Sequence, residues 1–158
     1  MFSQTVEYAL RAMVVLASRP HSRTGLPLTS HSIAIDSRVP PDYLIKVLQS
    51  LARSGLVTSQ RGKNGGHLLT RPSAEINILE IVNAVDPICR IRTCPLDLHG
   101  ENLCPLHRKM DDALALTESA FRSTSLAELL VGPIEGRPLC LETVGATGAA
   151  EEPLPCCV

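Results

Sequence analysis

The sequence predicts a mainly α-helical protein with one small β-hairpin. Apolar residues recur at helical spacing in several stretches, two short β-prone runs flank a glycine-rich turn, and a last long helical stripe follows a cysteine-rich loop. With 158 residues and a hydrophobic content of 44%, the chain is long enough for one ordinary domain with appendages. We divide it into residues 1–86, 87–131 and 132–158.

The first helix is expected over residues 4 to 18. Apolar residues there fall at i, i+3, i+4, i+7, i+8 and i+11, the pattern of a helix that packs one face on a core. This stripe consists of Val6, Ala9, Leu10, Met13, Val14 and Ala17. After a polar turn, Thr29 is a suitable N-cap for a short second helix through Ile33 and Ala34.

A third helix is expected to begin at Pro41, because proline suits the first turn of a helix, and to stop at Gly55. Its inner stripe is formed by Leu44, Val47, Leu48 and Leu51. Its outer face carries Asp42, Ile45, Lys46, Gln49 and Arg53. The helix therefore has one apolar face and one largely polar face.

Two short strands, residues 56–60 and 67–70, are expected to follow, joined by the turn RGKNGG. Asn64 and Gly65 in that turn are a strong hairpin signal, because the turn needs positive φ. The order helix, short helix, helix and hairpin is that of a winged helix-turn-helix, whose second motif helix enters the DNA major groove. At the hairpin tip, Arg61 and Lys63 can reach phosphates or an adjacent minor groove.

The charge distribution favours the same interpretation. The formal net charge is -1, which argues against a uniformly basic nucleic-acid binder. Between Arg38 and Arg71, however, six basic residues stand against the single acid Asp42. Taken singly, these charges could form an ordinary solvated surface. Their joint placement on the outer helix face and on the hairpin favours DNA binding.

Asn77 and Glu80 form a capping-box pattern for a helix that runs through Val85 and ends before Pro87. After the cysteine-rich loop, apolar residues return at helical spacing. This stripe consists of Met110, Ala113, Leu114, Thr117, Ala120 and Phe121. Little chain remains to cover it, so we expect a long dimerisation helix and a symmetric homodimer.

The last part of the chain is expected to contain little structure. Ser125 and Glu128 predict a capping box for a final short helix, Leu126 to Val131. From residue 132 to the end, eight of 27 residues are glycine or proline and four acids face one arginine, which predicts a disordered acidic tail. It contains Cys140, Cys156 and Cys157; the terminal pair Cys156 and Cys157 is interpreted as incidental, with a redox or metal role as the alternative.

Three cysteines and a histidine lie in the segment CRIRTCPLDLHGENLCPLH. Cys89, Cys94, Cys104 and His107 follow the pattern Cys-x4-Cys-x9-Cys-x2-His. Thiolates select zinc, copper(I) or iron-sulfur clusters, and the Cys-x2-Cys pairs of structural zinc sites are missing between the three cysteines. Looser spacings are ordinary around a cluster. The favoured interpretation is therefore an iron-sulfur cluster, with zinc and unliganded thiols as the alternatives.

The same loop could serve an enzyme, with Cys104 as nucleophile and His107 or His99 as base. No oxyanion-hole or substrate-positioning motif accompanies these residues, so we expect no catalysis. As metal ligands, His99 and Glu101 are weaker candidates for the position of His107.

The apolar run from Ala12 to Ala17 is too short to cross a bilayer. Glu7 precedes it where a signal peptide would carry basic residues. Six cysteines without a secretion signal favour a reducing compartment and metal chemistry over disulfides. We therefore expect a cytoplasmic protein with no membrane partner.

The first helix, the winged helix and the cysteine loop, in this order, resemble the bacterial winged-helix regulators of the IscR and NsrR type, over roughly residues 1 to 131. The segments that carry the resemblance are VEYALRAM (6–13), PPDYLIKVLQSLARSGLVTSQRGKNGGHLL (40–69), INILEIVNAVD (76–86) and the cysteine loop. The resemblance implies a homodimer that binds double-stranded operator DNA and carries a 2Fe-2S or 4Fe-4S cluster, which senses redox conditions, nitric oxide or iron-sulfur status. Relatives without the cysteines sense metabolites, so a regulator with structural zinc or no metal is the alternative.

Carried over to this chain, the resemblance implies that Cys89, Cys94 and Cys104 are ligands. For the fourth ligand it implies either His107 or Glu7, the latter from the opposite subunit. The second cysteine interval of nine residues is longer than the even spacing common in the family, which leaves the number of irons open. The implied DNA contacts are Asp42, Ile45, Lys46 and Gln49 on the third helix and Arg61, Gly62, Lys63 and Asn64 on the wing.

Overall fold

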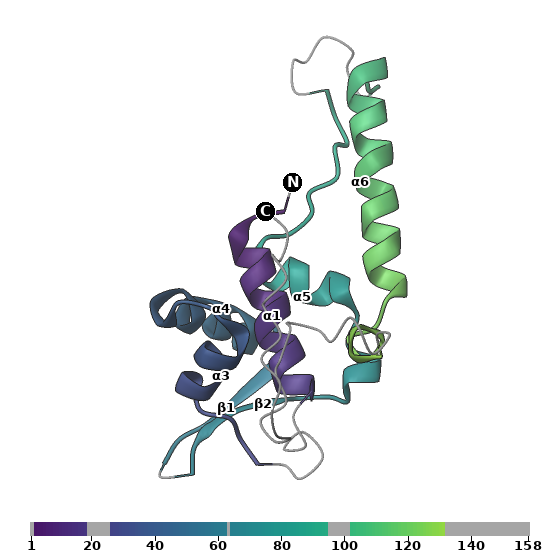
Figure 1. The fold of residues 1–158 in the computed structure, drawn as a ribbon. Coiled ribbons are helices and arrows are strands. Elements are labelled where there is room, and N and C mark those ends of the chain that lie inside the picture. Colours follow the sequence, from purple (N-terminus) through teal and green to yellow (C-terminus); the bar gives the residue numbers. More distant parts are fainter. Residues whose placement is uncertain (1, 19–25, 63, 95–101, 132–158) are drawn as a thin grey trace, which may run out of the picture.

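The computed structural model describes residues 2–18, 26–62, 64–94 and 102–131. Its helices and strands are α1 (Gln4–Ser18), α3 (Ser30–Ser37), α4 (Pro41–Arg53), β1 (Val57–Gln60), β2 (Gly66–Leu69), α5 (Ile78–Val85) and α6 (Pro105–Ser123), with single 3-10 turns η1 (Ser73–Glu75) and η2 (Glu128–Leu130). In Figure 1, α1 runs through the middle of a winged-helix unit formed by α1, α3, α4, α5 and the hairpin, and α6 stands upright beside that unit. The predicted fold class, a winged helix-turn-helix with a long additional helix, is confirmed.

The core of the winged-helix unit lies around α1. Because α3, α4 and α5 all contact α1, more of its surface is buried than one predicted stripe. Ala12, Val15 and Leu16 join the buried set, while Leu10 and Ala17 at the margin are only partly buried. A helix covered on several sides needs apolar residues around most of its circumference, and α1 has them.

The helix-turn-helix follows the predicted local signals. The Thr29 side chain accepts a hydrogen bond from the backbone N–H of Ser32 at 3.1 Å, which caps α3. Arg38 ends α3 in the left-handed conformation with φ of 52°, and α4 begins at Pro41. The predicted inner stripe of α4 is buried: Leu44, Val47, Leu48 and Leu51.

The wing is an antiparallel hairpin in which Val57 pairs with Leu69 and Gln60 with Gly66. The expectation that Asn64 and Gly65 supply the positive φ is wrong, because this conformation is found at Gly62 (116°) and Gly66 (158°). The reason is a tertiary contact. A Cβ atom on Gly66 would lie 2.4 Å from the carbonyl oxygen of Leu28, whose backbone also pairs with the wing. Glycine thus lets the wing approach the start of the helix-turn-helix closely.

α5 begins with the predicted capping box. The Asn77 side chain accepts a hydrogen bond from the Glu80 backbone N–H at 3.0 Å, and the Glu80 carboxylate accepts one from the Asn77 N–H at 3.3 Å. The second carboxylate oxygen of Glu80 pairs with Arg71 at 2.5 Å, which ties α5 to the end of the wing.

After α6, the chain returns to the winged-helix unit. Leu126 is fully buried, and its backbone N–H donates to the carbonyl of Ile76 at 2.7 Å. The predicted Ser125 and Glu128 contact forms, with Ser125 Oγ donating to Glu128 Oε1 at 2.7 Å. The predicted helix from 126 to 131 is wrong: only the turn η2 forms, because the backbone N–H groups of Leu126 and Ala127 donate to the carbonyls of Ile76 and Ser73. The division at residue 86 stays a prediction, and the predicted tail lies outside the described residues.

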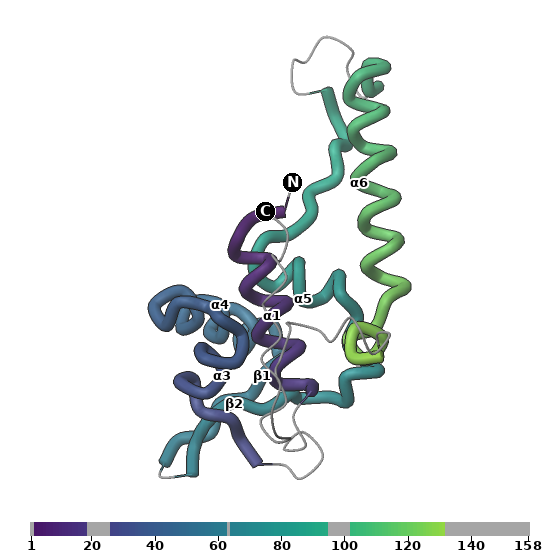
Figure 2. The backbone as a smooth tube through the Cα atoms, viewed as in Figure 1, coloured from purple at the N-terminus to yellow at the C-terminus, as the bar shows by residue number. Residues whose placement is uncertain are grey.

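α6 is 19 residues long and none of them is buried. In Figure 2, the backbone of α6 stands beside the winged-helix unit. The predicted apolar stripe divides in two. Leu114, Thr117 and Phe121 are partly covered on the side of the winged-helix unit, where the ring of Phe121 lies 5.1 Å from that of Phe2. The other members of the stripe, Met110, Ala113 and Ala120, are exposed, as are Leu106 and Leu116, which the predicted stripe did not include. Within the described part of the chain, no helix is both long and apolar enough to span a bilayer.

Candidate metal site and DNA-binding surface

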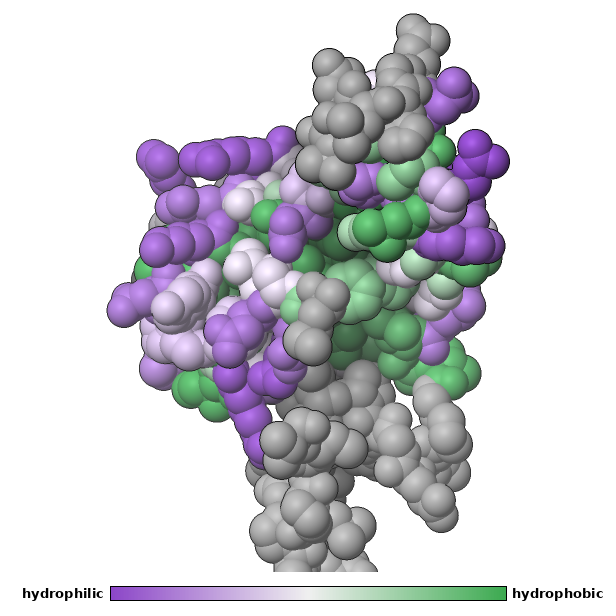
Figure 3. Space-filling model, turned by 90° about the horizontal axis from the view of Figure 1, so that it is seen from above, coloured by the Kyte–Doolittle hydropathy of each residue, from purple (hydrophilic) through white to green (hydrophobic). Residues whose placement is uncertain are grey.

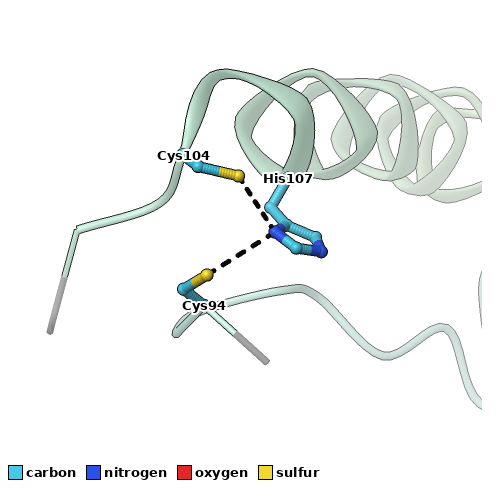
Figure 4. A group of neighbouring side chains, drawn as sticks. All are labelled: Cys94, Cys104 and His107. Carbon is cyan, nitrogen blue, oxygen red and sulfur yellow. Dashed lines mark hydrogen bonds between the residues drawn. The ribbon is translucent and has the colours of Figure 1, made fainter. Parts of the chain in front are cut away.

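Cys94, Cys104 and His107 meet at the N-terminal end of α6 (Figure 4). His107 Nδ1 lies 3.1 Å from Cys104 Sγ and 3.8 Å from Cys94 Sγ, and the three possible ligand atoms all lie within 4.8 Å of one another. Two thiolates and an imidazole form a donor set that zinc and iron-sulfur clusters accept. The structure therefore brings three of the five predicted ligand candidates together.

Local structure explains how α6 presents its two donors. Cys104 is the N-cap residue and Pro105 the first residue of α6, so the helix starts directly at a sulfur donor. His107 follows three residues later, and residues i and i+3 lie side by side on a helix. The N-terminal end of a helix favours negative charge, which suits thiolate ligands. Cys94 comes from the incoming loop and is buried against this turn.

A cluster of ion pairs fixes the incoming loop to α6. Arg90 donates two hydrogen bonds to Asp111, from Nε to Oδ1 at 2.6 Å and from a terminal nitrogen to Oδ2 at 2.5 Å. The Ile91 backbone N–H also donates to Asp111 Oδ1, at 2.9 Å, and Glu118 lies 3.5 Å from Arg90. The hydrogen bonds from Arg90 lower the pKa of Asp111, and the same contact raises the pKa of Arg90. Sequence reasoning missed this cluster.

Cys89 and Glu7, the two other predicted ligand candidates, lie elsewhere. Among the described residues, neither belongs to the group formed by Cys94, Cys104 and His107. Cys89 is exposed and lines a cavity of about 370 Å³ between α1, α5 and α6. Glu7 lies on the exposed side of α1 in an ion pair with Arg11. The weaker candidates His99 and Glu101 lie outside the described residues.

The outer face of α4 is exposed as predicted. Asp42, Ile45, Lys46 and Gln49 all lie on it. Seen from above (Figure 3), hydrophilic side chains crowd the left side of the molecule, where α4 lies in Figure 1. Tyr43 also belongs to this face and was missed: its ring is exposed, and Lys46 Nζ lies 5.9 Å from the ring centre. Aromatic rings and basic groups together suit contact with a polyanion.

A groove of about 350 Å³ separates α4 from the wing. His67 lines this groove and connects the start of α3 to the wing. Its Nε2 is 2.9 Å from Ser30 Oγ on α3, and its Nδ1 is 3.0 Å from Ser59 Oγ on β1. Partial burial lowers the pKa of His67. The sequence gave no signal for this bridge, because its partners are distant along the chain. At the wing tip, Arg61, Gly62 and Asn64 are exposed, and Lys63 lies outside the described residues.

A family model described as Rrf2, iron-dependent transcriptional regulator, matches residues 2–132. The chain belongs to the Rrf2 family. The resemblance to IscR-type regulators is thereby confirmed. The chain is also similar to a candidate HTH-type transcriptional regulator of Mycobacterium tuberculosis, Rv1287, with 36% identity over 91 residues. That match covers 57% of this chain and 55% of the relative, so it spans about half the length of the curated relative.

Solved structures of the same fold include three Rrf2-type regulators. CymR (YrzC), the global cysteine regulator of B. subtilis, has a TM-score of 0.66 and 26% identity, covering 82% of this chain and 95% of that chain. Staphylococcus aureus CymR has a TM-score of 0.59 and 26% identity, covering 83% and 98%. T. potens IscR has a TM-score of 0.67 and 24% identity, covering 82% and 85%. At that identity, the likeness to IscR is one of fold.

Proposed function

We propose that this Rrf2 protein is a cytoplasmic, homodimeric regulator of transcription that binds operator DNA and holds an iron-sulfur cluster in its cysteine loop. The observation that carries the proposal is the convergence of Cys94, Cys104 and His107 on the first turn of a long helix attached to a winged helix-turn-helix. A ligand site in this place is joined mechanically to a DNA-binding motif. We do not expect the protein to be an enzyme, since its family consists of transcriptional regulators.

The donor chemistry fits a cluster. Cys94 and Cys104 are thiol donors, which prefer iron-sulfur clusters, zinc or copper(I) over hard cations. We propose Cys89 as the third thiolate ligand, and as the fourth ligand either His107, whose Nδ1 lies near both sulfurs, or the partner subunit's Glu7. When bound, an iron-sulfur cluster supplies a centre that responds to redox conditions, nitric oxide and iron-sulfur supply.

The chain's own contacts provide a route from this site to DNA. Cys104 and His107 belong to α6, and the far end of α6 is fastened to the winged-helix unit through Phe121 and Leu126. α5 pairs with that returning segment and also packs on α4. A change in the loop that moves α6 can therefore change the positions of the two α4 helices of a dimer. Dimeric helix-turn-helix proteins are sensitive to this spacing, because their half-sites lie on successive major grooves.

For DNA contact we propose the outer face of α4, through Asp42, Ile45, Lys46 and Gln49, together with the wing. α4 is the second helix of the motif, which in such proteins lies in the major groove. The wing residues are Arg61, Gly62, Lys63 and Asn64. Exposure of the described members of both sets leaves their side chains free to meet phosphates and base edges.

The proposal is tested by preparing the full chain anaerobically and measuring iron, sulfide and visible absorption. We expect a coloured protein with iron and sulfide in near-equal amounts, and colourless proteins after Cys94→Ala or Cys104→Ala. Cys140→Ala, which removes a thiol outside the proposed site, should keep the colour. A colourless wild type that contains zinc would refute the cluster.

The remaining ligands are separated by cluster lifetime in the presence of a chelator. We expect Cys89→Ala and one of the pair Glu7→Ala and His107→Ala to shorten it. Arg11→Ala is the control for Glu7, because it removes the same ion pair but keeps the carboxylate. Wild-type lifetimes for both Glu7→Ala and His107→Ala would exclude both as ligands.

A second candidate function is a winged-helix regulator with a structural zinc, or with no metal, that responds to a metabolite. The observation in its favour is the small size of the group, because three donors within 4.8 Å of one another can surround a single ion. CymR, described as a global cysteine regulator, shares this fold at 26% identity. A zinc-loaded, colourless preparation with unchanged DNA binding after metal removal would favour this alternative.

A further inference from the structure

The ion-pair cluster around Asp111 lies next to the candidate metal site, one turn further along α6. Arg90 follows Cys89 directly and stands four residues before Cys94 on the incoming loop. Asp111 lies four residues after His107, which places it one turn further along the same face of α6. The contact between Arg90 and Asp111 therefore joins the segment that carries two cysteines to the helix that carries Cys104 and His107.

The geometry of this contact differs from that of an ordinary surface ion pair. Arg90 binds both carboxylate oxygens of Asp111, at 2.6 and 2.5 Å, and the Ile91 backbone N–H donates to one of them at 2.9 Å. Bidentate contacts fix direction as well as distance. The Asp111 side chain is only 16% exposed, whereas that of its neighbour Asp112 is 57% exposed and only approaches Lys109 at 3.7 Å.

Without this contact, little in the described residues would hold the loop against the N-terminal half of α6. Cys94 Sγ lies 3.8 Å from His107 Nδ1, but Cys94 stands ten positions before Cys104 along the chain. The chain itself therefore does not fix Cys94 beside α6. The described residues of α6 include none that is buried, so hydrophobic packing alone does not set the position of its N-terminal half. The three hydrogen bonds to Asp111 fix the position of the loop along the helix.

We infer that Asp111 is a positioning residue of the metal site: through Arg90 and the Ile91 N–H, it holds the Cys89–Cys94 segment at the height on α6 where Cys94 meets Cys104 and His107. The inference rests on the proposed function, because it requires that these side chains bind a metal. The Asp111 carboxylate would then raise the metal affinity of the site without contacting any ligand atom.

Cobalt(II) binding to the reduced, metal-free full chain tests the inference. Cobalt held by thiolates absorbs in the near-ultraviolet and visible, so its affinity can be titrated without a cluster or DNA. We expect Asp111→Ala and Arg90→Ala each to weaken cobalt binding at least tenfold. The matched control Asp112→Ala, the adjacent acid on the same helix, should stay within twofold of wild type.

Further variants separate positioning from a general loss of structure. Arg90→Lys keeps the charge but cannot bind both oxygens in the same way, so it should weaken cobalt binding while helix content and thermal midpoint of the metal-free protein stay unchanged. Asp111→Asn keeps an acceptor for the Ile91 N–H and should fall between wild type and Asp111→Ala. The double variant Arg90→Ala, Asp111→Ala should bind cobalt no worse than either single variant.

The outcomes are distinct. If Asp111→Ala and Arg90→Lys bind cobalt as tightly as Asp112→Ala does, the inference is overturned and the proposed metal site stands. If the wild type shows no thiolate-to-cobalt absorption, the proposed metal site fails, and the inference with it. If Asp111→Ala loses helix content, Arg90→Lys decides: wild-type affinity in that folded variant overturns the inference.

Discussion

The winged-helix unit and α6 are built on opposite principles. In the winged-helix unit, helices α1, α4 and α5 bury their apolar faces in one shared core. In α6, none of 19 residues is buried, and the helix is held by hydrogen bonds to Asp111 near one end and by Phe121 and Leu126 at the other. The first arrangement stabilises itself through burial, whereas the second depends on polar contacts and on whatever binds to it.

The exposed side of α6 strengthens this contrast. Leu106, Met110 and Leu116 are each about half exposed or more, and Leu116 is 73% exposed. Leu116 lies roughly opposite the side of α6 that carries His107, Asp111 and Glu118. A second copy of α6 would cover them, which agrees with the homodimer we propose.

The largest expected effect tests whether the core really belongs to the winged-helix unit alone. Leu51→Ala, at a fully buried position of α4, should lower the free energy of unfolding by about 2–5 kcal/mol, because it leaves a cavity. Leu106→Ala on α6 should change it by less than about 0.5 kcal/mol, measured by urea unfolding at a protein concentration low enough to keep the chain monomeric. Equal losses would show that α6 shares the same core.

A second prediction concerns the DNA-facing side of the winged-helix unit. Arg61→Ala should weaken operator binding by about 1–3 kcal/mol and relax sequence preference if Arg61 reads a base edge. Lys46→Ala should weaken binding to all sequences and reduce the salt slope by about one if Lys46 meets phosphate. Fluorescence anisotropy at several salt concentrations measures both effects. Metal loading should be unchanged in each variant, and wild-type affinity in both would show that DNA binds elsewhere.

A third prediction concerns the exposed apolar side of α6. Leu116→Glu places a charge on the exposed apolar side of α6 and should raise the dimer dissociation constant about tenfold or more, equivalent to about 1.4 kcal/mol. Sedimentation equilibrium measures this change. Ile35→Glu, at an exposed apolar position of α3, is the control and should leave the dimer intact. A dimer that tolerates Leu116→Glu would contradict dimerisation through this side.

The smallest effect should come from His67, between α4 and the wing. Burial lowers the pKa of His67 in the folded chain, so the unfolded chain binds the proton more readily. The free energy of unfolding should therefore fall as the pH drops below about 6.5 and level off below the folded pKa. His67→Gln should remove this part of the pH dependence in urea unfolding. An identical pH dependence in both proteins would contradict the assignment to His67.

The parts of the structure that depend on neighbouring residues were predictable from sequence. Thr29 caps α3 and Asn77 pairs with Glu80 within three residues, so the local pattern contains the whole contact. Cys104 and His107 were predicted together for the same reason. The positive φ of Gly66 was missed because it is imposed by Leu28, a residue far away along the chain.

The missed polar contacts share that property. Asp111 binds Arg90 across 21 residues, and His67 binds Ser30 across 37. Such pairs depend on where whole elements lie, and spacing along a sequence does not reveal it. Spacing also does not show which of the predicted ligands meet. The structure brings together Cys94, Cys104 and His107, while Cys89 lines the cavity between α1, α5 and α6.

α6 is attached to the core of the winged-helix unit near its C-terminal end, so a rotation about that end moves its N-terminal end the most. Leu126 lies in the core three residues after the end of α6, while Cys104 lies at the opposite end of the helix. At 1.5 Å per residue the helix is about 28 Å long, so a swing of about 2 Å at Cys104 corresponds to a rotation of only about 4° at the base. If the proposed site moves α6 in this way, a displacement of Cys104 would become a small change of angle where the helix joins the winged-helix unit.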